Sequence, residues 1–425
     1  MDKQIIFEDE HIRAIFLQGD SNILVLSFGD LITRASGLSI NAEKSLIKYQ
    51  YSVIGVMPKQ KSWFPKASMV ELAKVILPII QRFKNIVGYG GSMGGYAAIK
   101  YSNLLNMNRI IAFVPQYSID PEQVEDRRYA EFFDAVANKD MQIQLQDVDA
   151  SREYIIVYDP YFSIDREHYL KIKEILPSLH TIHLPFTGHE ALSVLASSSL
   201  LHDFIEHEFD ETYFYQQVRK IKKQSKFYYR NVLANVLTYH DSMLLKILRQ
   251  NDFQLDERYL DNALKQAVSR SLIKTKQATE QDFQKLGIKI QYSQQAENPK
   301  KGFKNQFEAI LVFNLINLKL ETYAVDVVLA NPSYLIPIVA EHTGVVQIEL
   351  NNELYLLGMN DRKIIKLFKQ GDALTSDMSP FVIKQYSDFF ALSYKQLNLN
   401  CDEQGVCDYV EGSVQPSQQF VLTSY

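Results

Sequence analysis

The stretch Gly88-Tyr-Gly-Gly-Ser-Met-Gly-Gly-Tyr96 decides how the first half of this chain folds. It follows the apolar residues Ile86 and Val87 and precedes a helix-forming run that begins at Tyr96. This order predicts a strand, a tight turn and a helix. Glycines surround Ser92 because neighbouring backbone must come close to this turn, where a larger side chain would clash. The N–H groups that open the new helix then point toward any negative charge that forms beside Ser92.

Residues 90–94 read Gly-Gly-Ser-Met-Gly and fit the pattern G-x-S-x-G, the nucleophile elbow. With its strand–turn–helix setting, this motif resembles the α/β-hydrolase superfamily, and the resemblance covers about residues 1–205. It implies a mostly parallel sheet flanked by helices. It also implies a serine nucleophile followed in chain order by an acid and a histidine.

Apolar runs alternate with helical patterns through the first half, which predicts right-handed crossovers and a mostly parallel sheet. The first two runs flank acidic residues and predict an antiparallel pair at the sheet edge. Helices are expected over residues 69–83, where apolar residues recur at helical spacing, and over the charged stretch 121–138. The expected strands are residues 5–7, 12–17, 23–28, 52–57, 85–88, 109–114, 153–158 and 181–184.

The residues that follow each strand are the candidates for chemistry, because such sheets bind ligands beyond the carboxyl ends of their strands. Ser92 follows the strand at 85–88 and needs a base, since an unassisted hydroxyl is a weak nucleophile at neutral pH. His189 follows the strand at 181–184, after a glycine that permits a sharp turn. Its place in the chain order of the superfamily predicts that His189 is this base.

Two aspartates on one loop, Asp159 and Asp165, are candidates for the acid. Asp159 lies at the strand end, where a carboxylate can reach the second nitrogen of His189 and fix its tautomer. Asp165 precedes Arg-Glu-His and is the expected N-cap of a helix that runs to Leu176. We therefore predict Asp159 as the acid and keep Asp165 as the alternative.

The oxyanion hole implied by the resemblance combines the backbone N–H of Met93 with one from Gly29 or Asp30. Superfamily members often carry His-Gly at the second position, whereas this chain reads Phe-Gly-Asp. An acidic side chain beside a developing oxyanion is repulsive unless it points away, for instance toward Arg34.

The aromatic pair Trp63 and Phe64 lies on the loop after the strand at 52–57, at the same sheet edge. Aromatic side chains on such a loop can stack on a substrate ring, sugar or acyl chain. A loop that its own aromatics hold inward explains the pair equally well.

Composition excludes several classes of protein. The net charge of −5 gives no overall attraction to nucleic acid or to an anionic membrane. No run of 18 uncharged apolar residues and no signal peptide is visible, so we expect a soluble protein without a transmembrane segment. The two cysteines, Cys401 and Cys407, are too few for a disulfide framework and indicate a cytoplasmic location. No metal-ligand spacing accompanies them, and we expect neither a metal nor a cofactor.

The second half of the chain differs in character, which predicts a hydrolase domain at residues 1–210, a helical linker or lid at 211–290 and a β-rich module at 291–425. A long helix is expected over 213–250, and Asn351-Asn352 between two β-branched runs predicts a hairpin. A basic cluster in this helix is either a solvated face or a site for an anionic polymer: Arg219, Lys220, Lys222, Lys223, Lys226 and Arg230.

The leading interpretation is a serine hydrolase of the carboxylic ester hydrolase class, acting through an acyl-Ser92 intermediate. Its expected substrate is an acyl ester of a small molecule or a glycan, and an acyltransferase would use the same residues. The rival interpretation is a binding or scaffold protein on a hydrolase fold whose chemistry is weak or lost. The Phe-Gly-Asp sequence at residues 28–30 favours this rival.

Overall fold

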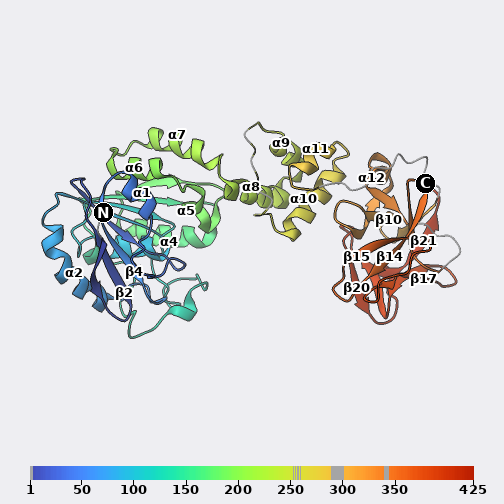
Figure 1. The fold of residues 1–425 in the computed structure, drawn as a ribbon, viewed down its shortest axis with the longest axis horizontal. Coiled ribbons are helices and arrows are strands. Elements are labelled where there is room, and N and C mark those ends of the chain that lie inside the picture. The colour runs from blue at the N-terminus through green and yellow to red at the C-terminus, as the bar shows by residue number, and fades with distance from the viewer. Residues whose placement is uncertain are drawn as a thin grey trace. The chain divides into compact units, whose positions relative to one another are not determined.

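A computed structural model describes residues 3–251, 253, 255, 258, 260–288, 301–338 and 344–425. The chain forms two compact units, one made chiefly of Met1–Asn235 and the other chiefly of Val236–Asn251 and Leu255–Tyr425. Figure 1 shows the first unit in blue to green and the second in yellow to red.

One sheet, with eight strands in the described residues, organises the first unit, in the order β1-β2-β4-β3-β5-β6-β7-β8. The β1–β2 and β2–β4 pairs are antiparallel and the other neighbours are parallel. This order confirms the predicted α/β-hydrolase-like, mostly parallel sheet. The strands are β1 (Lys3–Glu8), β2 (Ile12–Leu17), β3 (Ile23–Phe28), β4 (Ser52–Pro58), β5 (Asn85–Gly91), β6 (Arg109–Phe113), β7 (Glu153–Tyr158) and β8 (His180–His183).

Burial explains why these runs are strands. Every residue of β3 and β4 is buried, as expected of apolar strands that are covered on both faces. The edge strand β1 has no buried residue. The helices of this unit are α1 (Glu43–Lys48), α2 (Lys66–Ile80), α3 (Met93–Lys100), α4 (Ser163–Ile175), α5 (Ala191–Val194), α6 (Ser198–Glu206) and α7 (Glu211–Lys222).

The helix expected over residues 121–138 is wrong. This stretch consists of turns and one short 3-10 helix, η1 (Ala130–Phe132). Asp120, Asp126 and Asp134 each accept a hydrogen bond from the backbone N–H two residues further on. Aspartates that bind their own backbone in this way favour turns over a continuous helix.

The helix α7 packs on the core of the first unit, because its Phe214 and Val218 are buried together with residues of the sheet. The ring of Phe214 stacks on Phe204 of α6, with ring centroids 4.8 Å apart. The single helix expected over 213–250 is wrong: the chain forms α7, α8 (Lys226–Tyr239) and α9 (Leu244–Leu248) instead. The boundaries at 210 and 290 stay predictions.

Antiparallel β-structure dominates the second unit, as the sequence predicted. Within the described residues, one sheet contains nine strands, and the isolated bridge between Glu321 and Val406 joins its two edges. A smaller sheet holds β13 to β16. The strands are β9 (Gly302–Asn305), β10 (Ala309–Asn314), β11 (Lys319–Ala324), β12 (Leu335–Pro337), β13 (Gln347–Leu350), β14 (Glu353–Met359), β15 (Ile365–Lys369), β16 (Ser379–Pro380), β17 (Val382–Gln385), β18 (Phe390–Tyr394), β19 (Leu397–Cys401), β20 (Cys407–Glu411) and β21 (Phe420–Thr423).

The turn between β13 and β14 and the two cysteines can be compared with the sequence analysis. Asn351 and Asn352 both have positive φ and connect β13 to β14, which confirms the predicted hairpin. Cys401 and Cys407 are register partners across β19 and β20, and both are free thiols. Residues 291–300 of the predicted module lie outside the described residues. The helices of the unit are α9, α10 (Asn262–Lys274), α11 (Glu280–Gln284) and α12 (Val325–Ala330).

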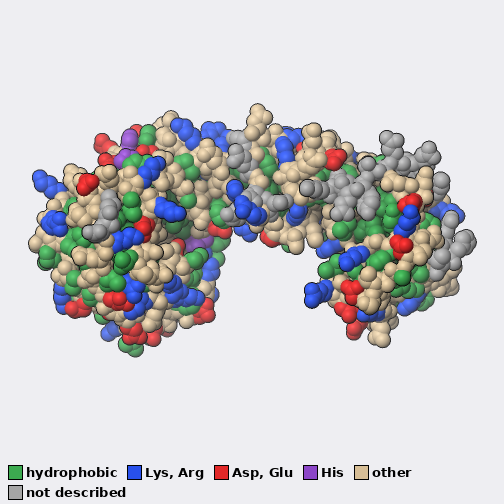
Figure 2. Space-filling view, viewed as in Figure 1, with side chains coloured by type: hydrophobic (Ala, Val, Ile, Leu, Met, Phe, Trp, Pro, Cys, Tyr) green, Lys and Arg blue, Asp and Glu red, His purple; other side chains and the backbone are tan. Residues whose placement is uncertain are grey.

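The surface of the first unit carries both signs of charge. On the face that Figure 2 shows, Lys and Arg side chains are interspersed with Asp and Glu. Among the described residues, no helix combines the length and the apolar character needed to cross a bilayer.

Candidate active site

Ser92 is the single residue between the end of β5 and the start of α3. Its backbone angles are φ 52° and ψ −119°, a conformation that is strained for a residue with a side chain. The turn is fixed on both sides, because the N–H of Ser92 donates to the Phe113 carbonyl at 2.8 Å and its own carbonyl accepts from Tyr96. This backbone holds the Ser92 side chain at the carboxyl end of the sheet.

Two glycines make this turn possible. A Cβ at position 90 would lie 2.4 Å from the backbone of Gly94, and a Cβ at position 94 would lie 2.6 Å from the carbonyl oxygen of Phe28. Contacts this short would force backbone to move. The second contact also shows that the start of α3 packs directly against the end of β3.

His189 lies between Ser92 and a carboxylate. Its Nε2 is 2.9 Å from the Oγ of Ser92, and its Nδ1 is 2.9 Å from both carboxylate oxygens of Asp165. The carboxylate accepts the Nδ1 hydrogen, which assigns the free lone pair to Nε2. A histidine held in this tautomer can accept the hydroxyl proton of Ser92.

The expectation that Asp159 contacts the ring of His189 is therefore wrong. Asp159 Oδ2 accepts the backbone N–H groups of Thr187 and Gly188, at 2.9 and 2.8 Å, and Oδ1 accepts that of Tyr161. These bonds turn the carboxylate toward the main chain of the loop that carries His189. Asp165 is not the N-cap of α4, which is Phe162, but lies in the first turn of the helix.

A buried charge network surrounds the carboxylate of Asp165. Arg128 Nη2 donates to Asp165 and to Asp126 at 2.8 Å each, and His168 Nε2 lies 3.1 Å from Asp126. The Tyr117 N–H donates to His168 Nδ1, so the hydrogen of this imidazole is on Nε2. Burial opposes the ionisation of Asp126, but hydrogen bonds from His168 and Arg128 outweigh it and hold the pKa of this carboxyl well below its usual value. Arg128 thus gives Asp165 a second partner besides His189 and ties it to this network.

The N–H groups predicted to form the oxyanion hole differ in whether they are already hydrogen-bonded. The N–H of Met93 is the first of α3 and has no acceptor within that helix. The N–H of Gly29 donates to the Val56 carbonyl at 3.0 Å, because Gly29 continues the ladder between β3 and β4. Asp30 is then the candidate from this loop. Its carboxylate does turn away, but toward the N–H groups of Ile32 and Thr33, not toward Arg34.

Of the two explanations left open for Trp63 and Phe64, the structure agrees with the loop that its own aromatics hold inward and not with stacking on a substrate. Both side chains are fully buried, and both residues have positive φ. Trp63 packs against Tyr129 with ring centroids 5.1 Å apart, and Phe64 packs edge-on against Phe28. The loop turns its aromatics inward, so they support the site through their contacts with Tyr129 and Phe28.

Two residues that contact the reacting atoms were missed. Gln116 Nε2 donates to Ser92 Oγ at 2.9 Å, and the Tyr129 hydroxyl lies 3.1 Å from His189 Nε2. Gln116 follows β6, so the rule that sites lie beyond strand ends would have found it. Tyr129 had no comparable signal, because its stretch reads as a charged helix in the sequence.

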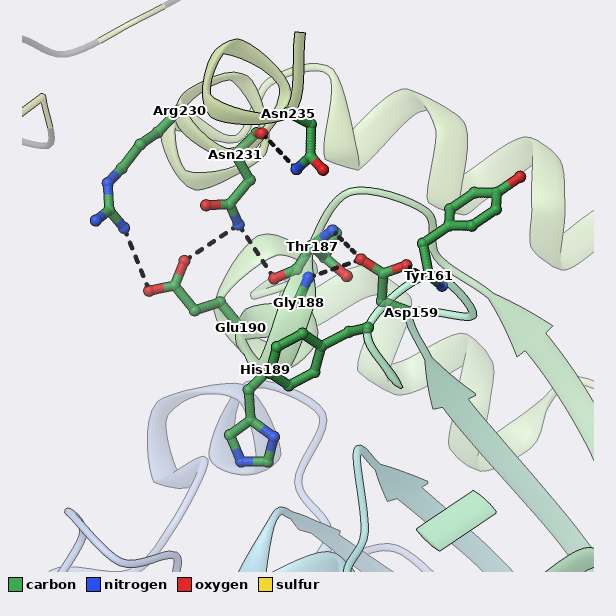
Figure 3. A pocket seen from close by; sticks show the side chains of 10 residues that line it. Asp159, Tyr161, Thr187, Gly188, His189, Glu190, Arg230, Asn231 and Asn235 are labelled. Atoms are coloured by element: carbon green, nitrogen blue, oxygen red, sulfur yellow. Dashed lines mark hydrogen bonds and ion pairs between the residues drawn. The ribbon is translucent and has the colours of Figure 1, made fainter. Parts of the chain in front are cut away.

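Residues 187–190 of the His189 loop and side chains of α8 line a polar hollow of about 250 Å³ (Figure 3). Asn231 donates to the Thr187 carbonyl and to Glu190, and Arg230 pairs with Glu190 at 3.6 Å. The ring of His189 points away from Asn231 in this view. The side chains from α8 therefore bind the loop on the side away from the imidazole ring.

Known proteins offer limited comparison. No protein family and no curated protein sequence matches this chain. A sugar hydrolase from Lactococcus lactis is similar in structure at 14% identity and a TM-score of 0.37, over 52% of this chain and 100% of that chain. The capsule O-acetyltransferase of Neisseria meningitidis serogroup A is similar at 14% identity and a TM-score of 0.35, over 50% and 93%. Similarities this distant say nothing about activity, so the fold assignment rests on the strand order.

Proposed function

We propose that this protein is a serine hydrolase that cleaves a carboxylic ester through an acyl-Ser92 intermediate. One observation carries the proposal: Ser92 Oγ, His189 Nε2, His189 Nδ1 and the Asp165 carboxylate form a continuous hydrogen-bonded chain. Ser92 is the nucleophile of the elbow and His189 the general base. Asp165, rather than Asp159, holds the imidazole in its productive tautomer.

The proposed reaction has two halves. Ser92 Oγ attacks the ester carbon while its proton moves to His189 Nε2, and the carbonyl electrons move onto the oxygen. The N–H groups of Met93 and Asp30 stabilise this oxyanion. The intermediate then expels the alkoxide, which takes the proton from His189, and leaves acyl-Ser92. Water attacks the acyl group in the same manner and restores the hydroxyl of Ser92.

Replacement of the nucleophile tests this proposal. We expect Ser92→Ala to lower kcat for p-nitrophenyl acetate by a factor on the order of 10⁴ or more, and to abolish labelling by a fluorophosphonate. Ser178→Ala, at an exposed serine between α4 and β8, is the matched control and should react as the wild type does. Undiminished turnover in Ser92→Ala would refute the assignment.

A binding or scaffold protein with weak chemistry is the second candidate function. The bond from the Gly29 N–H to Val56 favours it, because it removes one expected oxyanion donor. The two candidates differ in the wild type itself. Labelling of Ser92 by the fluorophosphonate supports the enzyme, and an unlabelled wild type supports the binding protein.

A further inference from the structure

Tyr129 places a hydroxyl group beside the atom that exchanges protons in the proposed reaction. Its oxygen lies 3.1 Å from His189 Nε2. The triad itself does not need this group, because Ser92 already donates to Nε2 and Asp165 already binds Nδ1. A second hydroxyl at Nε2 therefore requires its own explanation.

The ring of Tyr129 is held rigidly. It packs against Trp63, and the guanidinium of Arg128 lies 5.1 Å from its centroid. Trp63 in turn stacks on Phe132. Burial raises the pKa of Tyr129, so the hydroxyl keeps its hydrogen at neutral pH and is available as a donor. The structure thus presents a fixed donor whose position does not depend on a bound ligand.

Gln116 and Tyr129 are both hydrogen-bond donors at the site, and the contact that Gln116 makes indicates which oxygen each one binds. Gln116 is fully buried, and its Nε2 donates to the Oγ of Ser92 at 2.9 Å. The nucleophilic oxygen thus already has a donor. The hydroxyl of Tyr129 also interacts with Ser92 in the resting site. Because Gln116 already binds Oγ, this hydroxyl is available for the other oxygen of the reaction, which must also approach His189 Nε2.

We propose that Tyr129 is a catalytic residue that binds the oxygen of the leaving alcohol and, later, of the attacking water; this inference rests on the proposed function. In the first half, the C–O bond of the ester breaks, the leaving oxygen takes the proton from His189 Nε2, and Tyr129 donates a hydrogen bond to that oxygen. In the second half, water gives a proton to Nε2 as its oxygen bonds to the acyl carbon. The Tyr129 hydroxyl then holds this oxygen in place, and Ser92 Oγ leaves with the proton from His189.

This role predicts a dependence on the leaving group that a purely structural role would not produce. A p-nitrophenolate ion is stable without help, so its departure does not need Tyr129. An alkoxide is a poor leaving group and needs both the proton from His189 and the hydrogen bond. Whatever the leaving group, the attack by water on acyl-Ser92 needs the Tyr129 hydroxyl to hold the oxygen of the water in place.

Burst kinetics of full-length Tyr129→Phe test the proposal. This variant keeps the ring that packs on Trp63 and removes only the hydroxyl. With p-nitrophenyl acetate we expect an unchanged burst rate and a steady state slowed by about tenfold, the scale of one lost hydrogen bond. With methyl acetate, acylation should slow by about tenfold as well. Tyr239→Phe, at an exposed phenol at the end of α8, should match the wild type in all three measurements.

Other outcomes separate the two proposals. If Tyr129→Phe slows the burst and the steady state by the same factor, or slows neither, the role of Tyr129 is refuted while acylation of Ser92 stands. If the wild type shows no burst that depends on Ser92, the proposed function fails, and this inference fails with it.

Discussion

The end of β7 and the first turn of α4 each supply a buried aspartate, and the two do different work. Asp159 is 3% exposed and binds only backbone N–H groups among the described residues. Asp165 is 2% exposed and binds the imidazole of His189 and the guanidinium of Arg128. The strand end therefore anchors the loop of the histidine, while the helix one turn later orients its ring.

This difference shows that the rule that sites lie beyond strand ends predicts the region of the acid but not which of two nearby aspartates it is. Five residues separate Asp159 from Asp165, and both lie beyond the carboxyl end of β7. The choice between them depends on what each oxygen faces. Asp159 Oδ2 accepts two backbone N–H groups and Oδ1 accepts a third, so the carboxylate faces the main chain, whereas both oxygens of Asp165 face Nδ1 of His189.

The largest expected effect is that of Asp165→Asn. An amide can donate to His189 Nδ1 and hold the ring hydrogen on Nε2, which is the wrong tautomer for a base. We expect kcat for p-nitrophenyl acetate to fall by a factor on the order of 10⁴, measured at saturating substrate. Circular dichroism should show an intact fold. If instead Asp165→Asn keeps its activity and Asp159→Asn loses it, the comparison is reversed and Asp159 is the orienting acid.

A smaller effect is expected of Asp159→Asn. The amide presents its NH₂ group to a backbone N–H of Tyr161, Thr187 or Gly188, so at least one buried donor loses its acceptor. We expect the free energy of unfolding in urea to fall by about 1–3 kcal/mol. The kcat should fall by roughly tenfold, because a looser loop holds His189 less well. Unchanged stability would show that the Asp159 bonds do not restrain the loop.

The fold of the first unit could be predicted from the sequence because its central strands, such as β3 and β4, are mostly apolar and buried throughout. Such runs stand out from helices by their length and by the glycines at their ends. The nucleophile turn was equally clear, since Gly90 and Gly94 stand where backbone contacts leave no room for a Cβ. The pairing of Ser92 with His189 followed from the chain order.

The remainder of the site depends on contacts that leave no periodic signal. Arg128 and Tyr129 reach the site from an irregular stretch, whose course is set by aspartates that bind their own backbone. The sequence left two explanations open for Trp63, because the direction in which its loop turns depends on contacts with Tyr129 that leave no pattern in the sequence. The hydrogen bond that occupies the N–H of Gly29 is a matter of strand register, which the sequence does not specify to one residue.

Asn231→Ala tests the same loop from its other side and should have the smallest effect. Asn231 Nδ2 donates to the Thr187 carbonyl at 3.1 Å and to Glu190 at 3.3 Å, across a hollow that water can enter. Water can replace both bonds, so we expect a loss of stability below about 1 kcal/mol and a two- to threefold lower kcat, about the worth of one exposed hydrogen bond.

Asn235→Ala is the matched control for this substitution. Its Nδ2 donates only to the carbonyl of Asn231 among the described residues, so it lines the same hollow without a bond to the His189 loop (Figure 3). We expect its kcat to equal that of the wild type. A loss at Asn231 as large as that at Asp159 would show that α8 restrains the histidine loop as strongly as the strand end does. Equal effects at Asn231 and Asn235 would instead assign the change to the hollow in general, and the buried carboxylate of Asp159 would then be the anchor that sets the position of His189.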